Sequence, residues 1–182
     1  MIVVAQDTSR YGTDLGDGKR LLPTLLKELC AIEDLHWVRL HYVYPDEIDE
    51  ELIDVIASEQ KIVKYLDIPI QHCNSEILEK MNRRGNGEYL RWLLKTLREK
   101  IPGLVLRSSI ITGLPGEGEE EFRELCQFLK DMRMERVGAF PFSPQEGSEA
   151  AKMEHVDFEV AQERAQIIEE LQSRIMDDWN DS

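Results

Sequence analysis

The stretch LVLRSSIITGLPGEGEEEF, residues 104–122, decides the fold because it contains a strand, a turn and the start of a helix. Residues 104–112 are mostly apolar and include valine and isoleucine, which favours a strand. Gly113, Pro115 and Gly116 then predict a tight turn with an exposed backbone. Apolar residues at helical spacing follow over residues 119–132. The stretch therefore predicts one complete strand–turn–helix unit.

The same alternation extends along the whole chain. Further strands are predicted over residues 2–6, 37–43, 65–70 and 136–140, and further helices over residues 21–32, 48–57, 75–81, 88–101 and 158–179. Five strands separated by helices favour a parallel sheet. A closed eightfold barrel typically needs about 250 residues, and this chain has 182. We therefore predict a single α/β domain over residues 1–182, an open, partial TIM-like barrel with outer helices. An open doubly wound sheet is the alternative.

Polar residues collect where the predicted strands end. The first strand, residues 2–6, reads as buried on both faces, yet it runs directly into a polar cluster. The segments that follow the five strands are QDTSRYG (6–12), HYVYPDE (41–47), DIPIQHCNS (67–75), TGLPGEGEEEF (112–122) and FPFSPQEGS (140–148). Parallel βα folds bind ligands at the C-terminal ends of their strands. These segments predict a site there, although turn residues in ordinary βα loops are the alternative.

The turn at residues 113–116 exposes backbone N–H groups at a helix start, an arrangement that suits anions. The glutamates that follow, at positions 117 and 119–121, would repel a phosphate, and the lysine of a phosphate-binding loop is missing. A zwitterion or an adenosine therefore suits this turn better. Arg107 and Ser109 share one face of the preceding strand. A buried arginine there requires a carboxylate, either from the protein or from a ligand.

Composition restricts the classes of partner. The net charge is −14, and lysine and arginine are scattered rather than clustered, so direct binding to nucleic acid is not expected. The acid excess fits either simple solubility or a basic protein partner. No apolar run approaches the roughly 20 residues of a membrane span, and the first residues do not resemble a signal peptide. A cytoplasmic location without membrane contact is the expectation.

The cysteines predict no metal ligands. Cys30, Cys73 and Cys126 lie far apart, without the close spacing that iron–sulfur ligation requires. The four histidines form no ligand pattern either, and each reads as a surface residue or a satisfied core residue. His72 and Cys73 are neighbours in sequence, but a catalytic Cys/His pair normally meets in space. A nucleophile and base at this pair is the minor interpretation.

Four segments, in this order, resemble the radical S-adenosylmethionine domain of the methylthiotransferases: VAQDTSRYG (4–12), YLDIPIQH (65–72), RSSIITGLPGEGEEEF (107–122) and FPFSPQEGS (140–148). The resemblance covers almost the whole chain. Gln6-Asp7-Thr8 resembles the RimO-type branch, which methylthiolates an aspartate of small-subunit ribosomal protein twelve, whereas the tRNA-modifying branch has Gln-Asn there. The resemblance implies S-adenosylmethionine and a [4Fe–4S] cluster as cofactors of the parent protein, and a basic ribosomal protein as partner.

The resemblance also implies roles for individual residues. Gln71 would line the S-adenosylmethionine pocket, and Arg107 and Ser109 would face the polar end of the cofactor. Ile111 would contact the adenine, which the backbone of residues 140–143 would border. The cofactor-binding residues implied in this way are Gln71, Arg107, Ser109, Ile111, Gly113, Phe140 and Phe142, and the substrate-side lip consists of Gln6, Asp7 and Thr8.

Parts of the family pattern are missing. The resemblance places a C-x3-C-x2-C loop, which holds the [4Fe–4S] cluster, before the first strand of this chain, together with a further barrel strand. That loop is absent, as are an N-terminal domain and a C-terminal TRAM domain. We therefore expect this chain alone to be inactive and assign no catalytic residue to it. The alternatives are a tRNA methylthiotransferase of the same family, a non-catalytic module that binds an adenosyl group or a protein, and an unrelated hydrolase or aldolase using Asp7 and Asp67.

Overall fold

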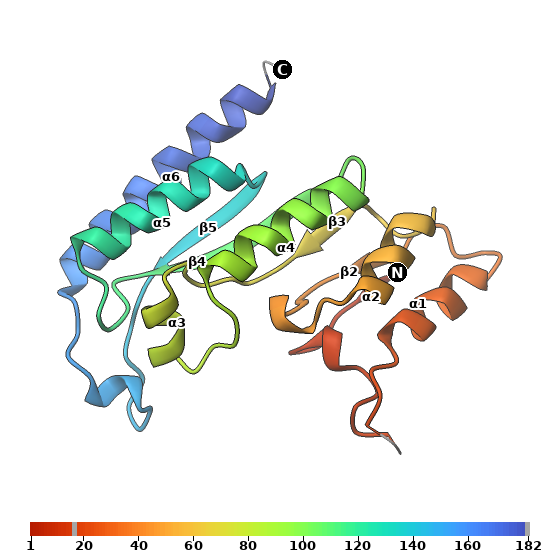
Figure 1. The fold of residues 1–182 in the computed structure, drawn as a ribbon, viewed down its shortest axis with the longest axis horizontal. Helices are drawn as coiled ribbons and strands as arrows, with labels where there is room; N and C mark the ends of the chain where they lie inside the picture. Colours follow the sequence, from red (N-terminus) through yellow and green to blue (C-terminus); the bar gives the residue numbers. More distant parts are fainter. Residues whose placement is uncertain (16–17, 181–182) are drawn as a thin grey trace. The chain divides into compact units, whose positions relative to one another are not determined.

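The computed structural model describes residues 1–15 and 18–180, and in this part of the chain strands alternate with helices (Figure 1). The strands are β1 (Ile2–Val3), β2 (Arg39–Leu40), β3 (Tyr65–Asp67), β4 (Val105–Thr112) and β5 (Arg136–Pro141). The α-helices are α1 (Leu22–Ala31), α2 (Glu50–Ser58), α3 (Ser75–Lys80), α4 (Gly87–Lys100), α5 (Glu119–Met132) and α6 (Phe158–Asn180). Short 3₁₀ helices lie at Thr8–Arg10, Pro45–Glu47 and Ala150–Lys152.

The chain forms two compact units. Unit 1 comprises Met1–Pro69 and Trp92–Arg107, and unit 2 comprises Ile70–Arg91 and Ser108–Ser182. Both α4 and β4 therefore begin in one unit and end in the other. Each unit is described by itself below.

Unit 1 contains two parallel strand pairs. β1 pairs with β2, and β3 pairs with the first part of β4 in the register Asp67 to Arg107. Helices α1 and α2 pack against each other. The core of this unit is formed by fully buried aliphatic side chains, among them Leu26, Leu40, Ile53, Ile56 and Leu66. Burial of such side chains supplies most of the favourable free energy of folding.

Unit 2 is built on the second part of β4, whose other neighbour in the three-stranded sheet is β5. The long helix α6 packs along β5 and also contacts α5 (Figure 1). The apolar stripe of α6 therefore covers this part of the unit. Leu125 and Phe128 of α5 and Ile168 of α6 are fully buried. They form the core that holds both helices in place.

The predicted helices agree closely with the structure, and the strand pairs whose direction is defined are parallel, as predicted. Helix α5 has the predicted bounds, Glu119–Met132, and the other five α-helices differ by one or two residues at their ends. The first four strands are shorter than predicted, above all β1 and β2, whereas β5 extends one residue further than predicted. No helix in the described residues combines the length and the apolar character that a membrane crossing requires.

One prediction about β1 is wrong. Its side chains are not buried on both faces, since Ile2 is 61% exposed and Val4, just beyond the strand, is 58% exposed. Among the described residues β1 pairs only with β2, through hydrogen bonds from Arg39 N to Met1 O and from His41 N to Val3 O. Apolar sequence alone does not report which side of a strand is covered. The outer side of β1 is open, and an apolar hollow bordered by Leu25 and Leu29 of α1 lies beside it.

Asp49 caps helix α2, and its replacement tests that local interaction. The Asp49 carboxylate accepts a hydrogen bond from Leu52 N at 2.9 Å and also pairs with Arg20 NH2 at 2.9 Å. Asp49→Ala should lower the free energy of unfolding by about 1 kcal/mol because an N-cap is lost. Asp49→Asn keeps a capping oxygen and loses only an exposed ion pair, so it should stay within about 0.5 kcal/mol of the parent. Urea unfolding measures both variants, and equal losses would assign the effect to the ion pair.

Candidate functional site

A small pocket in unit 2 brings together two of the residues singled out by the sequence, Gln71 and Ile111. Its remaining apolar walls come from α3 and its C-terminal end and from the turn after β4: Ile77, Leu78, Met81 and Leu114. The hollow is a small surface depression with about 270 Å³ of empty volume, part of which is open solvent. Apolar walls with a few convergent polar groups are typical of small-molecule sites. The pocket is therefore the candidate binding site of this unit.

Gln71 is held by its backbone. It adopts the left-handed conformation with φ +67°, which is uncommon for a residue other than glycine. Its N–H donates to Ser109 O at 3.0 Å, and its carbonyl accepts from Ile111 N at 2.9 Å, so it continues the parallel pairing beside β4. Among the described residues the side-chain amide of Gln71 has no hydrogen-bond partner, which leaves both its donor and its acceptor for a ligand.

The side chains on the two faces of β4 have different roles. On one face Ser108 Oγ accepts a hydrogen bond from Ile70 N at 3.2 Å, and Thr112 Oγ1 donates to Ala161 O at 2.8 Å. Both side chains are fully buried. Ser109 and Ile111 lie on the other face and are half-buried. Within the described residues the Ser109 hydroxyl has no partner, so this face offers a free polar group beside the apolar Ile111.

The carboxylate of Glu117, a residue of the turn after β4, closes that turn by a hydrogen bond to its backbone. Gly113 has φ +74°, and its N–H donates to Glu117 Oε1 at 2.9 Å. A Cβ added at Gly113 would lie 2.4 Å from Ala161 Cβ on α6, so only glycine allows this close approach. Glu117 is 2% exposed, so its side chain does not lie on the surface. It is part of the interior of the turn.

Phe140 and Phe142 flank the same end of β4. Phe142 N donates to Thr112 O at 2.8 Å, which ties the segment after β5 to the end of β4. The Phe142 ring is half-buried and lies 6.0 Å from the His155 ring, centroid to centroid. Phe140 is 53% exposed. The backbone of this segment is thus fixed beside Gly113, while the Phe140 ring remains available for contact.

Arg107 lies in unit 1, and its partner there is an internal carboxylate. Arg107 NH1 donates to Asp67 Oδ1 at 2.7 Å and to Oδ2 at 2.8 Å, and Asp67 is 1% exposed. The hydrogen bond to Asp67 raises the pKa of Arg107, so its positive charge persists at all physiological pH values. His41 Nδ1 lies 3.5 Å from the same carboxylate. The sequence left open whether the carboxylate partner of Arg107 comes from the protein or from a ligand, and in the structure Asp67 of the protein is a partner.

The three residues of the proposed lip, also in unit 1, differ in exposure. Gln6 is exposed, and Asp7 accepts hydrogen bonds from the backbone N and the hydroxyl of Ser9. Thr8 is 2% exposed; its hydroxyl donates to His41 O at 2.6 Å and accepts from Ala5 N at 3.1 Å. Thr8 therefore anchors the segment to the chain after β2, and Gln6 is the residue of the three that presents its side chain to solvent.

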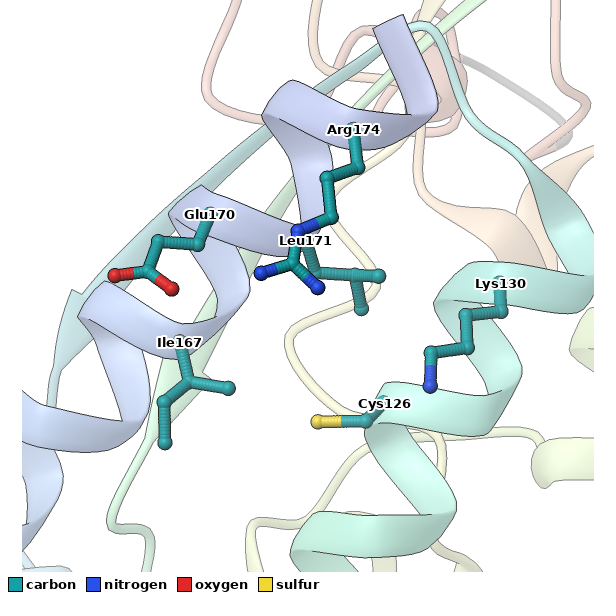
Figure 2. A pocket seen from close by; sticks show the side chains of 6 residues that line it. All are labelled: Cys126, Lys130, Ile167, Glu170, Leu171 and Arg174. Atoms are coloured by element: carbon teal, nitrogen blue, oxygen red, sulfur yellow. The ribbon is translucent and has the colours of Figure 1, made fainter. Parts of the chain in front are cut away.

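The cysteines do not form a site for an iron–sulfur cluster. Cys30 and Cys73 are buried, and burial raises the pKa of the Cys73 thiol to about 12. In the described residues no group of three or more histidine, cysteine, aspartate or glutamate side chains could hold a metal ion. Figure 2 shows Cys126 and Lys130 of α5 facing Ile167, Leu171 and Arg174 of α6 across a separate surface hollow. Thiolate ligands for a cluster are thus not provided.

One group of interacting residues was missed by the sequence analysis. Arg164 on α6 donates from NH1 to Glu117 Oε1 at 2.8 Å, across 47 positions of sequence. His72 is fully buried and lies close to the same carboxylate, with its Nε2 unpaired. The one signal in the sequence was an arginine within the apolar stripe of residues 158–179, next to Ala161 and Ala165. Long-range pairing of this kind cannot be read from local periodicity.

Comparison with known proteins identifies relatives of the chain. The family model described as "Radical SAM superfamily" matches residues 8–129. The ribosomal protein uS12 methylthiotransferase RimO of Lachnoclostridium phytofermentans is 52% identical over 153 residues, which is 84% of this chain and 34% of that protein. The RimO of an Anaeromyxobacter species is 48% identical over 174 residues, 95% of this chain and 37% of that protein. The chain thus spans little more than a third of the length of these relatives.

Solved structures agree on the fold. Coproporphyrinogen III oxidase (HemN) of Escherichia coli, a radical SAM enzyme, aligns with a TM-score of 0.63 and 20% identity over 76% of this chain and 32% of its own. The radical S-adenosylmethionine methyltransferase TsrM of Kitasatospora setae aligns with a TM-score of 0.54 and 23% identity over 66% of this chain and 24% of its own. At this level of identity the likeness shows the fold alone. It confirms the predicted partial barrel over the doubly wound alternative.

Gly113→Ala should destabilise unit 2 because the added methyl group meets α6. Gly103→Ala is the matched control, since Gly103 has a similar φ of +73° with nothing within 4 Å of its added Cβ. The control should lose about 1–2 kcal/mol of unfolding free energy from backbone strain. Gly113→Ala should lose a further 1–3 kcal/mol, roughly the cost of overpacking. Urea unfolding measures the free energy of unfolding of both variants. Equal losses would show that α6 moves away from the added methyl group without a loss of stability.

Thiol labelling tests the burial of the cysteines. Burial raises the pKa of all three thiols, but Cys126 is partly exposed whereas Cys30 and Cys73 are buried. Iodoacetamide reacts with the thiolate, so at pH 8 we expect Cys126 to be alkylated first and the other two to stay unmodified in the folded protein. Peptide mass spectrometry reads the pattern, and labelling in urea, where all three should react, is the control. Rapid alkylation of Cys73 in the folded chain would contradict the prediction.

Proposed function

The chain belongs to the radical SAM superfamily, and from this premise we propose that it is the core of a methylthiotransferase that modifies an aspartate of ribosomal protein uS12. The single observation that carries the proposal is the identity of 52% over 153 residues to a RimO protein named for that activity. The net charge of −14 supports it, because a basic ribosomal protein would be attracted to an acidic surface. A substrate of this kind would place the reaction in the cytoplasm.

The pocket in unit 2 fits the adenosyl part of S-adenosylmethionine. Ile111 and Leu114 offer an apolar surface of the kind on which an adenine packs. The unpaired side-chain amide of Gln71 can both donate to and accept from a purine or a ribose. Ser109 adds a free hydroxyl on the same face of β4 as Ile111. Arg83 also lines the pocket and adds a positively charged side chain to these neutral groups.

The remaining cofactor residues have narrower roles in this proposal. Gly113 supplies no side chain, and this lets α6 approach the turn closely. Phe140, exposed on β5, and the backbone at Phe142 would border the adenine. In unit 1, Arg107 commits NH1 to Asp67 and keeps further N–H donors, and its side chain is 33% exposed. Within that unit, we propose that these donors can receive a ligand carboxylate.

The [4Fe–4S] cluster of radical SAM enzymes supplies the electron that cleaves S-adenosylmethionine. The cysteines of this chain do not fit such a cluster, since two are buried and no ligand group forms among the described residues. The residues described here would bind and orient the adenosyl group and exclude water from it. We therefore propose that the chain by itself binds an adenosyl group without cleaving it, and that cleavage requires cluster ligands from elsewhere.

An exchange of segments tests the proposed function. This chain would replace the matched segment of the Lachnoclostridium phytofermentans RimO, and the purified chimera would be reconstituted with iron and sulfide. We expect it to add one methylthio group to the aspartate of uS12, detected by peptide mass spectrometry. The unmodified relative is the positive control, and the same chimera with Gln71→Ala should bind S-adenosylmethionine more weakly.

Two results would contradict the proposal. A chimera that holds its cluster and cleaves S-adenosylmethionine, yet leaves uS12 unchanged, would remove the ribosomal protein as substrate. Methylthiolation of tRNA by that chimera would assign the chain to the tRNA-modifying branch instead. Cleavage of S-adenosylmethionine by the 182-residue chain alone would contradict the second part of the proposal.

A further inference from the structure

A buried group of ionisable side chains lies behind the turn that follows β4. Its members are Glu117, Arg164 and His72, which are 2%, 6% and 0% exposed. Arg164 NH1 donates to both the backbone O and Oε1 of Glu117 at 2.8 Å, and NH2 donates to Glu119 Oε1 at 2.8 Å. All of these residues belong to unit 2. The group is thus one connected ion-pair network inside a single unit.

Glu117 is paired with Arg164 inside the unit. A carboxylate taken out of water is costly unless a cation and hydrogen bonds replace its hydration. Burial by itself would lower the pKa of Arg164, but the hydrogen bonds to Glu119 and Glu117 outweigh this and raise it. Arg164 therefore stays charged and neutralises the buried carboxylate. Without Arg164, the buried Glu117 carboxylate would lose this ion pair, and keeping it in the interior would become costly.

The carboxylate of Glu117 in turn fixes one wall of the pocket. Its Oε1 accepts the N–H of Gly113 at 2.9 Å. Gly113 stands between Ile111, two residues earlier, and Leu114, both of which line the pocket. The position of these two apolar side chains thus depends on a hydrogen bond that the Glu117 carboxylate makes only while it stays inside.

His72 connects the Glu117 carboxylate to the segment at Gln71, which also lines the pocket. It follows Gln71 directly, and its Nδ1 accepts a hydrogen bond from Asn74 N at 2.9 Å, which places the proton of the neutral ring on Nε2. Nε2 lies 3.4 Å from Glu117 Oε2, and both atoms are buried without a hydrogen-bond partner. A donor and an acceptor held this close can form a full hydrogen bond after a small shift of either segment. Both sides of the pocket therefore meet at Glu117.

Arg164 lies outside residues 8–129, the part of the chain that the family model matches. It is presented by α6, the helix that also approaches Gly113 through Ala161. Two independent contacts thus join α6 to the turn that forms the pocket wall.

We propose that Arg164 is a positioning residue for the adenosyl pocket, acting through Glu117 on the turn at Gly113 and on the segment at Gln71. The inference rests on the proposed function, because it assumes that the pocket binds the adenosyl group. In this proposal α6 acts on the binding site indirectly, because among the described residues no residue of α6 lines the pocket.

Substitution of Arg164 in the full 182-residue chain tests the proposal. Arg164→Gln should weaken the binding of S-adenosylmethionine, measured by titration with ligand-observed NMR, roughly tenfold or more. Arg164→Lys keeps the cation and should recover part of the affinity. Arg174→Gln on the same helix is the matched control, since Arg174 borders the hollow at Cys126 instead (Figure 2). The control should bind as the parent does.

Hydrogen exchange separates positioning from general destabilisation. In Arg164→Gln the amide of Gly113 should exchange faster, while the core amides of α5 around Phe128 keep their rates. A purely structural role would accelerate both together. If Arg164→Gln does not fold, Glu117→Gln, which keeps the shape of the side chain and removes its charge, should show the same loss of affinity and the same local exchange.

The outcomes distinguish the two proposals. If the parent chain binds S-adenosylmethionine, and the Arg164 and Glu117 variants bind equally well with unchanged exchange at Gly113, the inference about Arg164 is overturned and the proposed function stands. If the parent chain does not bind S-adenosylmethionine at all, the adenosyl pocket is wrong, and the inference about Arg164 is overturned with it. Weaker binding with faster exchange confined to Gly113 and its neighbours supports both.

Discussion

The alternating pleat of β4 is the constraint on which both units depend. Successive side chains point to opposite faces of a strand, so a shift of one residue would exchange the buried face and the open face. Leu106, Ser108, Ile110 and Thr112 are all buried. The two hydroxyls among them bond to Ile70 N and to Ala161 O, which fixes the register to the chain on either side. The open face, with Ser109 and Ile111, is available for a ligand only because the other face carries the structural hydrogen bonds.

The end of β4 needs more than a local turn. A glycine with positive φ, a carboxylate that folds back and a cation from another helix are all required to close it. Each of these features is unfavourable by itself: glycine loses more conformational entropy on folding, and a buried ion pair must overcome its desolvation. Sequence rules are broken most often where a binding site requires it. Such a concentration of unfavourable elements beside one pocket indicates that the geometry of this turn serves binding more than stability.

The sequence predicted elements well where many residues repeat one signal. Helix α5 has the predicted bounds, and α6 differs by one residue, because each carries several turns of apolar periodicity. Strands are harder, since β propensity extends beyond the residues that pair; β2 is two residues long within the seven predicted. The burial of β1 was wrong because an apolar run does not report what covers it. The alternation of side chains along a strand correctly predicted that Ser109 and Ile111 lie on one face. The left-handed backbone of Gln71 and the pairing of Arg107 with Asp67 could not be predicted in this way, because both depend on neighbouring chain segments.

Binding and electron transfer make different demands on a protein. An adenosyl group needs a shaped apolar hollow and a few neutral hydrogen-bonding groups, which a β-strand, a turn and the helices packed on them can supply. A cluster needs closely spaced thiolates on one accessible segment. The described residues meet the first demand at Gln71, Ser109 and Ile111, and they do not meet the second, since Cys73 is buried with its thiol pKa raised to about 12. The proposed recognition of the adenosyl group would therefore be a property of the βα core itself. That core also contains the charged network of Glu117 and Arg164, so in the proposed arrangement a change in this network would alter the affinity for the cofactor through the shape of the pocket.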